Sequence, residues 1–191
     1  MRRFFTFCFL LFSLSAFAQN EAELGLITRI NATDLGSRTG LNGYQFGFFY
    51  RKMITDKLAF DTGLSLRKQR QQAKIFAPIN DVDVHYMTAP LAGRYFFKKN
   101  LYARLGLNFD MLVKARTSTE TVGGFQKAED YYHYFHLGAA MGFGYVIKNK
   151  VDVHVEYTYG LNKTFVEPSI ASHNETNVYI SLGLGWILYS E

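Results

Sequence analysis

The sequence of 191 residues has one cysteine and three prolines, and its formal charge of +5 is small for its length. The cysteine, Cys8, lies in a segment that we expect to be removed. The mature chain then has no thiol for disulfides, thiolate metal sites or cysteine nucleophiles. After that segment, no apolar run approaches the roughly 20 residues of a membrane-crossing helix. Basic residues are not gathered on one face or helix, which argues against a nucleic-acid partner.

The first 18 residues have the layout of a cleaved secretory signal peptide. Two arginines precede an apolar stretch at residues 4–15, and residues 16–18 (Ala-Phe-Ala) provide a small-residue cleavage site. The apolar stretch is too short to span a membrane as a helix. We therefore expect residues 1–18 to be removed and residues 19–191 to form a single domain.

Most of the remaining sequence alternates apolar residues with polar or small ones, as a strand with two different faces does. In residues 151–161 every odd position is apolar and every even position is polar or glycine. A tilted strand that crosses a membrane needs roughly 9–11 residues. The sequence predicts an all-β fold, a single eight-stranded antiparallel transmembrane β-barrel. The eight segments are about 23–31, 42–52, 57–67, 82–96, 101–114, 134–145, 151–161 and 178–188.

The connections between these segments alternate between long and short, as in outer-membrane barrels with long external loops and short periplasmic turns. An even number of strands then places both termini in the periplasm of a Gram-negative cell. A β-sandwich or a soluble lipocalin-like barrel would share the alternation, but two groups of aromatic residues near the strand ends favour the membrane barrel. These groups are Tyr50, Tyr95, Tyr102, Tyr145 and Trp186 near the short turns, and Tyr44, Tyr86, Tyr131, Tyr157 and Tyr159 near the long loops. Pro90 predicts a bulge in the fourth segment.

Residues 86–96 (YMTAPLAGRYF) followed by residues 101–106 (LYARLG) resemble the PorT-like outer-membrane β-barrel family. The architecture is also similar to that of the small OmpA-type and OmpX-type barrels. The resemblance implies a barrel over the whole mature chain. It implies little about activity, because many members are known only as outer-membrane proteins and a few are linked to protein secretion.

The predicted inward faces carry cations and carboxylates in similar numbers. The interior of an eight-stranded barrel is only wide enough to be filled by side chains, and an isolated charge there costs several kcal/mol. We predict an ion network that plugs the lumen, with a gated ion path or proton relay as the alternative. The same alternation assigns Lys114 to the interior. The predicted network comprises Arg51, Asp61, Arg94, Arg104, Asp152 and Glu156.

The best local candidate for catalysis or metal binding is His154, which has Asp152 and Glu156 on the same face. A hydrolytic triad also needs a serine at the same level, and none is present. The histidines show no ligand spacing for a metal. We expect no catalytic site, no metal and no cofactor.

The predicted external loops are basic, and lipopolysaccharide phosphates are the nearest dense anions outside an outer membrane. The candidate contacts are Arg67, Lys68, Arg70, Lys74 and Arg116. The alternative is that these loops are simply solvated. We predict a non-enzymatic outer-membrane protein that acts as an anchor, structural element or interaction partner. An accessory subunit of a secretion or assembly complex and a lipid-modifying enzyme remain alternatives.

Overall fold

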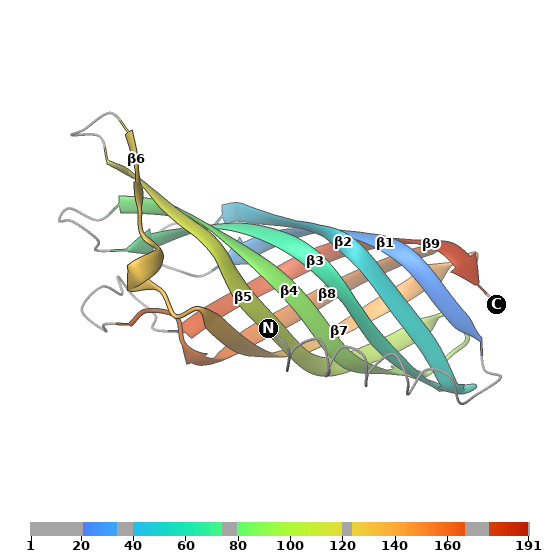
Figure 1. Ribbon diagram of the computed structural model, residues 1–191. Helices are drawn as coiled ribbons and strands as arrows, with labels where there is room; N and C mark the ends of the chain where they lie inside the picture. The colour runs from blue at the N-terminus through green and yellow to red at the C-terminus, as the bar shows by residue number, and fades with distance from the viewer. Residues whose placement is uncertain (1–20, 34–39, 74–79, 120–123, 167–175, 191) are drawn as a thin grey trace, which may run out of the picture.

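The computed structural model describes residues 21–33, 40–73, 80–119, 124–166 and 176–190, and these form a β-barrel (Figure 1). No helix in these ranges is long and apolar enough to cross a membrane. The elements are β1 (Ala22–Thr33), β2 (Gly40–Thr55), β3 (Leu58–Ala73), β4 (Asn80–Phe96), β5 (Leu101–Thr119), β6 (Gly124–Lys127), the 3-10 helix η2 (Glu129–Tyr131), β7 (Phe135–Ile147), β8 (Val151–Lys163) and β9 (Thr176–Ser190).

Eight antiparallel strands close the barrel, which confirms the predicted fold class. The strands follow the order β4-β3-β2-β1-β9-β8-β7-β5, and β4 pairs with β5 to complete the ring. The first strand also pairs with the last, from Glu23 opposite Ser190 to Thr33 opposite Tyr179. Closure leaves no unpaired strand edge in the ring. Strands inside hydrocarbon require such closure, because no water is present there to bond with free backbone N–H and C=O groups.

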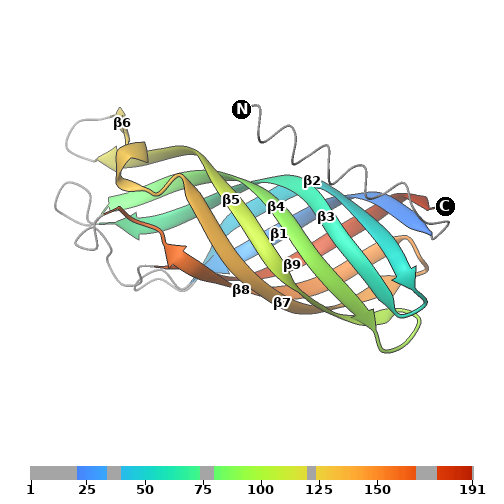
Figure 2. The same cartoon turned by 60° about the horizontal axis from the view of Figure 1, so that its bottom comes forward.

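The two ends of the barrel differ. Short turns join β2 to β3, β4 to β5 and β7 to β8 at one end, which we name the turn end and where β9 also finishes. The turn before β8 has positive φ at Lys148 and Asn149, as a tight hairpin turn requires. The opposite end, the loop end, carries β6 and η2 (Figures 1 and 2).

The loop end departs from the sequence prediction in two ways. Residues 115–130, predicted as a link, continue β5 to Thr119 and return as β6, which pairs only with β5. The sequence also predicts a bulge at Pro90, but the β4–β5 register runs unbroken through it. The register shift lies instead between His85 and Tyr86, where Val113 of β5 is the extra residue.

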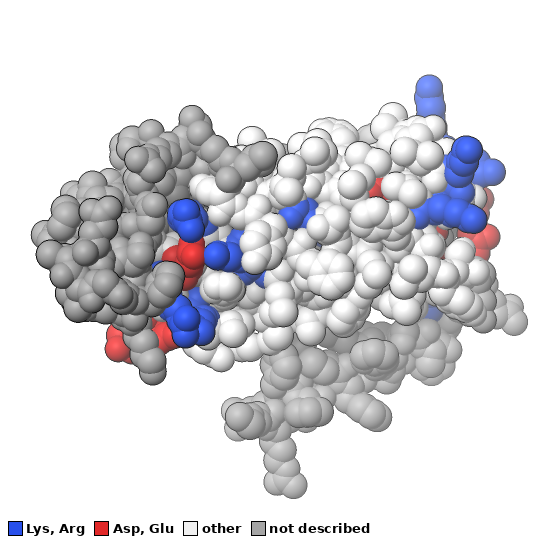
Figure 3. Space-filling view, turned by 90° about the horizontal axis from the view of Figure 1, so that it is seen from above, with Lys and Arg blue, Asp and Glu red and all other residues white. Residues whose placement is uncertain are grey.

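The outer surface is largely apolar and much of the interior is charged or polar, which is the reverse of a soluble barrel. Leu105 and Phe143 are each 67% exposed, whereas Arg51 and Glu156 are 1% exposed. Charged side chains visible on the wall gather mainly toward the two ends (Figure 3). Most of the aromatic residues assigned to the two girdles face outward, but Tyr86 and Tyr102 are wholly buried. Their positions on the strands place them inside the barrel.

Candidate functional site

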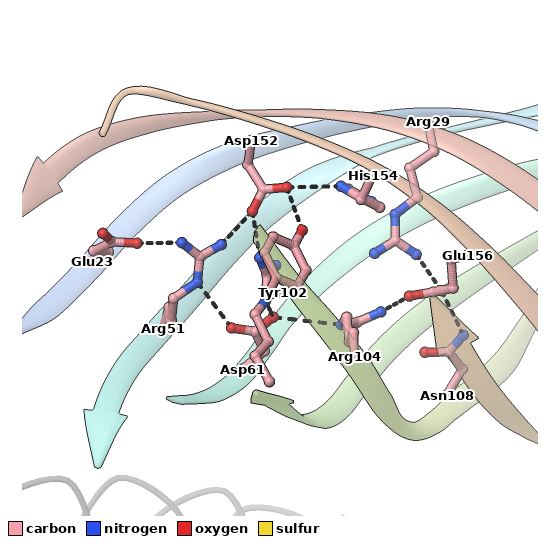
Figure 4. A network of polar contacts seen from close by, with 11 residues as sticks. Glu23, Arg29, Arg51, Asp61, Tyr102, Arg104, Asn108, Asp152, His154 and Glu156 are labelled. Carbon is pink, nitrogen blue, oxygen red and sulfur yellow. Dashed lines mark hydrogen bonds and ion pairs between the residues drawn. The ribbon is translucent and has the colours of Figure 1, made fainter. Parts of the chain in front are cut away.

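The turn-end half of the interior holds an ion network centred on Arg51. Arg51 lies opposite Asp61 on the neighbouring strand, and its Nε is 3.2 Å from Asp61 Oδ1. Its Nη2 is 2.5 Å from Asp152 Oδ2, and its Nη1 is 2.5 Å from Glu23 Oε2. One buried guanidinium therefore contacts carboxylates from β1, β3 and β8 (Figure 4).

Two further arginines, Arg94 and Arg104, face each other across β4 and β5. Arg94 donates to Asp61, and its Nη1 is 2.5 Å from Asp152 Oδ2. Arg104 Nε lies 3.5 Å from Asp61 Oδ2, and Arg104 also pairs with Glu156. The two facing cations are therefore compensated by carboxylates from β3 and β8, which is the arrangement that buried charge requires. All six residues of the predicted network lie together.

The structure adds members that sequence reasoning did not assign to this network. Arg29 Nη1 donates to Glu156 Oε1 at 2.8 Å, and the Tyr102 hydroxyl donates to Asp152 Oδ1 at 2.6 Å. His154 Nδ1 lies 3.1 Å from the same Asp152 oxygen. The alternation places these residues inside the barrel. The contacts of Arg29 and Tyr102 each pass over one intervening strand, so the pairing of adjacent strands does not reveal them.

Two glycines make room for the large side chains of the network. A Cβ at Gly144 would overlap the Tyr102 hydroxyl, and a Cβ at Gly183 would overlap His154 Nε2. Each glycine lies on a strand inside the barrel, where the absence of a side chain allows another residue to approach closely.

A separate ion pair lies nearer the loop end. Arg67 Nη2 is 2.6 Å from Asp110 Oδ2, and Thr88 donates to Asp110 Oδ1 at 2.6 Å. The Arg67 guanidinium lies between the rings of Tyr86 and Tyr179, at 4.9 and 4.4 Å from their centroids. Arg67 is 1% exposed. The prediction that Arg67 contacts external lipopolysaccharide is therefore wrong, because its position on β3 turns it inward.

Beyond this pair, an apolar cluster lies at the loop end, beside the buried side chains of Gln69 and Asn177, which hydrogen-bond to each other. We name this cluster the apolar cap; it was not expected from the sequence, because its covering residues belong to a segment without strand periodicity. Tyr132 and Phe165 form a β-bridge, and their rings lie 4.9 Å apart. Burial raises the pKa of the Tyr132 hydroxyl well above its usual value. The apolar cap comprises Val82, Val84, Tyr86, Leu112, Ala115, Ala128, Tyr132 and Phe165.

The outer wall at the loop end carries a charged array on three adjacent strands. Strand pairing aligns its residues in two rows. Asp83 accepts contacts from Lys68 Nζ at 2.8 Å and Arg70 Nε at 3.0 Å. Figure 3 shows basic and acidic side chains together toward this end of the wall. We name this array the basic grid; its rows are Lys68, His85 and Lys114, and Arg70, Asp83 and Arg116.

The grid contains three of the predicted lipopolysaccharide contacts: Lys68, Arg70 and Arg116. Lys74 lies outside the described residues. The assignment of Lys114 to the interior is wrong, because the bulge at Val113 changes which face the following residues occupy.

His154 is a member of the ion network and has no catalytic partner among its contacts within the described residues. Its ring contacts Asp152, while the hydroxyl of Ser181 donates to the Glu156 carbonyl oxygen at 3.4 Å. Within the described ranges, no group of three His, Cys, Asp or Glu side chains could hold a metal ion.

At the turn end, a pocket of about 470 Å³ is lined by Glu23, Arg51, Phe96 and Lys99, among others.

The fold resembles solved outer-membrane proteins. Ail of Yersinia pestis, solved with the heparin analogue sucrose octasulfate, is 14% identical with a TM-score of 0.51, covering 90% of this chain and 100% of Ail. Neisserial surface protein A is 17% identical with a TM-score of 0.48, covering 88% and 97% respectively. A search of curated proteins finds no match. The model of the outer membrane protein beta-barrel domain matches residues 4–187, and the chain therefore belongs to this family of Gram-negative outer-membrane proteins.

Proposed function

We propose that this protein is a non-enzymatic outer-membrane anchor or interaction protein whose lumen is plugged. The observation that carries the proposal is the compensation of the interior charges. Each of the five inward arginines is at most 5% exposed and contacts at least one carboxylate. A conducting pore needs a continuous aqueous path, whereas this interior pairs its charges with one another and holds the apolar cap and the hydrogen-bonded pair Gln69 and Asn177 at its loop end.

We also propose the orientation and the processing of the chain. Removal of residues 1–18 would leave a mature chain that begins just before β1. The turn end would face the periplasm and the loop end the exterior, because outer-membrane barrels have short periplasmic turns and longer external loops. Both termini would then be periplasmic, and the basic grid would lie in the outer leaflet beside lipopolysaccharide.

The second candidate is an accessory subunit of a secretion or assembly complex. The resemblance of residues 86–106 to PorT-like barrels favours it. The extension of β5 and β6 beyond the ring provides surface for a protein contact. Such a subunit would use the same closed barrel as an anchor and would differ in having a stable protein partner.

Cross-linking in native membranes, followed by purification in mild detergent, tests the proposal. We expect a barrel that carries lipid and no stoichiometric secretion component. Recovery of a fixed set of secretion proteins would favour the second candidate. Lipid mass spectrometry of cells with and without the gene tests the enzyme alternative. A change in the acyl chains of the lipids that depends on the protein would support an enzyme.

A further inference from the structure

The basic grid lies at the edge of the apolar wall, in a position that fits a lipid headgroup. The outward row next to it on the same strands is Leu66, Met87 and Met111. Leu66 is 63% exposed and Val113 is 56% exposed. A lipid whose acyl chains lie along these residues would have its headgroup level with the grid.

The bulge at Val113 places two cations of the grid, Lys114 and Arg116, on the outer face of β5. Leu112 and Ala115 are both buried inside the barrel, so both residues between them face away from the lumen. Without the extra residue, Lys114 would point into the apolar cap. Because a bulge re-aims the side chains that follow it, this irregularity brings Lys114 and Arg116 beside His85 and Asp83.

The charges of the grid are only partly compensated by the protein. Asp83 is engaged by Lys68 and Arg70. Lys114 and Arg116 form no ion pair within the described part of the chain. The four cations of the grid lie on strands about 4.8 Å apart and in rows about 7 Å apart. This spacing suits an anion with more than one charged group.

Toward β2 and β1, the charge of the first row ends at Lys68. Along the same ladder row, the residue next to Lys68 is Tyr44 on β2, and the next is Ile30 on β1. These two side chains are 57% and 44% exposed. On this side the grid therefore gives way to aromatic and aliphatic side chains and does not continue as a row of cations.

We infer that the basic grid binds the phosphate groups of an outer-leaflet glycolipid of the lipid A type, with Lys114 and Arg116 as the cations that contact it. The inference rests on the proposed orientation of the barrel. Lys and Arg bind phosphate through charge-assisted hydrogen bonds. The adjoining apolar row favours a lipid over a soluble polyanion, because only a lipid would also cover Leu66 and Val113.

Titration of the purified, folded protein with bisphosphorylated lipid A, read by native mass spectrometry, tests the inference. The variant Lys114→Gln/Arg116→Gln should bind it about tenfold more weakly than wild type, since two charge-assisted contacts are lost. The matched control Lys98→Gln/Lys150→Gln removes the same charge from exposed turn-end positions. It should bind within about twofold of wild type. Heat-modifiable migration in detergent establishes that each variant is folded.

Equal binding by the grid variant and wild type would overturn the inference, as would equal binding of dephosphorylated lipid A. Displacement of the lipid by sucrose octasulfate at an equal concentration would also overturn it, because the site would then recognise a soluble polyanion. Membrane cross-linking tests the proposed function separately. A barrel without protein partners whose grid fails to bind lipid A would overturn only this inference.

Discussion

The two halves of the barrel interior are filled by different chemistry. Near the turn end, Arg51, Arg94 and Arg104 share Asp61, Asp152 and Glu156 in one connected network. Near the loop end, aliphatic and aromatic side chains pack together and are covered by the segment around η2. Loss of one member should therefore have different consequences. A buried charge left without its partner affects the whole barrel, whereas a lost ring leaves a local cavity.

The largest effect is expected for Asp61→Ala. This change removes a carboxylate that contacts Arg51, Arg94 and Arg104, and leaves buried guanidinium groups undercompensated. The free energy of unfolding should fall by about 3–5 kcal/mol. Urea titration of the folded protein in detergent or lipid measures it.

The double variant Arg51→Ala/Asp61→Ala serves as the control for this prediction. Removing both partners leaves less uncompensated charge, so the double variant should be more stable than the sum of the two single losses implies. Additive losses would contradict a connected network.

The next effect concerns the outer wall. Leu105, which is 67% exposed, should lie in hydrocarbon. Leu105→Arg should destabilise the inserted barrel by about 2–4 kcal/mol if it lies near the midplane. Leu105→Ala, the size control without charge, should cost much less. Equal stability of the two variants in lipid would mean that this face does not contact hydrocarbon.

A smaller and more local effect is expected in the apolar cap. Phe165→Ala removes a buried ring that packs on Tyr132 and should cost about 2 kcal/mol, less than in a closed core because the cap lies at one end of the barrel. Hydrogen exchange should accelerate around η2, while β2 and β3 remain protected. Equal acceleration throughout the ring would show that the cap and the network are one cooperative unit.

The smallest effect on stability is expected for Asp83→Asn in the basic grid. Its partner Arg70 is largely exposed, with 56% of its side chain accessible, so the ion pairs should contribute less than about 1 kcal/mol. Binding of bisphosphorylated lipid A should strengthen at the same time, because the only carboxylate of the grid is lost. Weaker binding by this variant would show that Asp83 positions Lys68 and Arg70 for the lipid.

Much of the fold follows from the sequence because strand alternation has a period of two and the connections alternate in length. The pair Arg51 and Asp61 could also be predicted, since they flank a short turn symmetrically. Arg29 and Tyr102 could not be assigned to the network, because their partners lie on strands that are not adjacent to their own. Lys114 was misassigned because one extra residue in a strand reverses the faces that follow.

The most direct test of the proposed plug is single-channel conductance of the wild-type protein in planar bilayers. Protection from protease and heat-modifiable migration should first establish insertion. A plugged lumen predicts no resolved current steps at neutral pH, because the inward charges are paired and the apolar cap lies at the loop end. Stable, ion-selective steps from the wild-type barrel would contradict it.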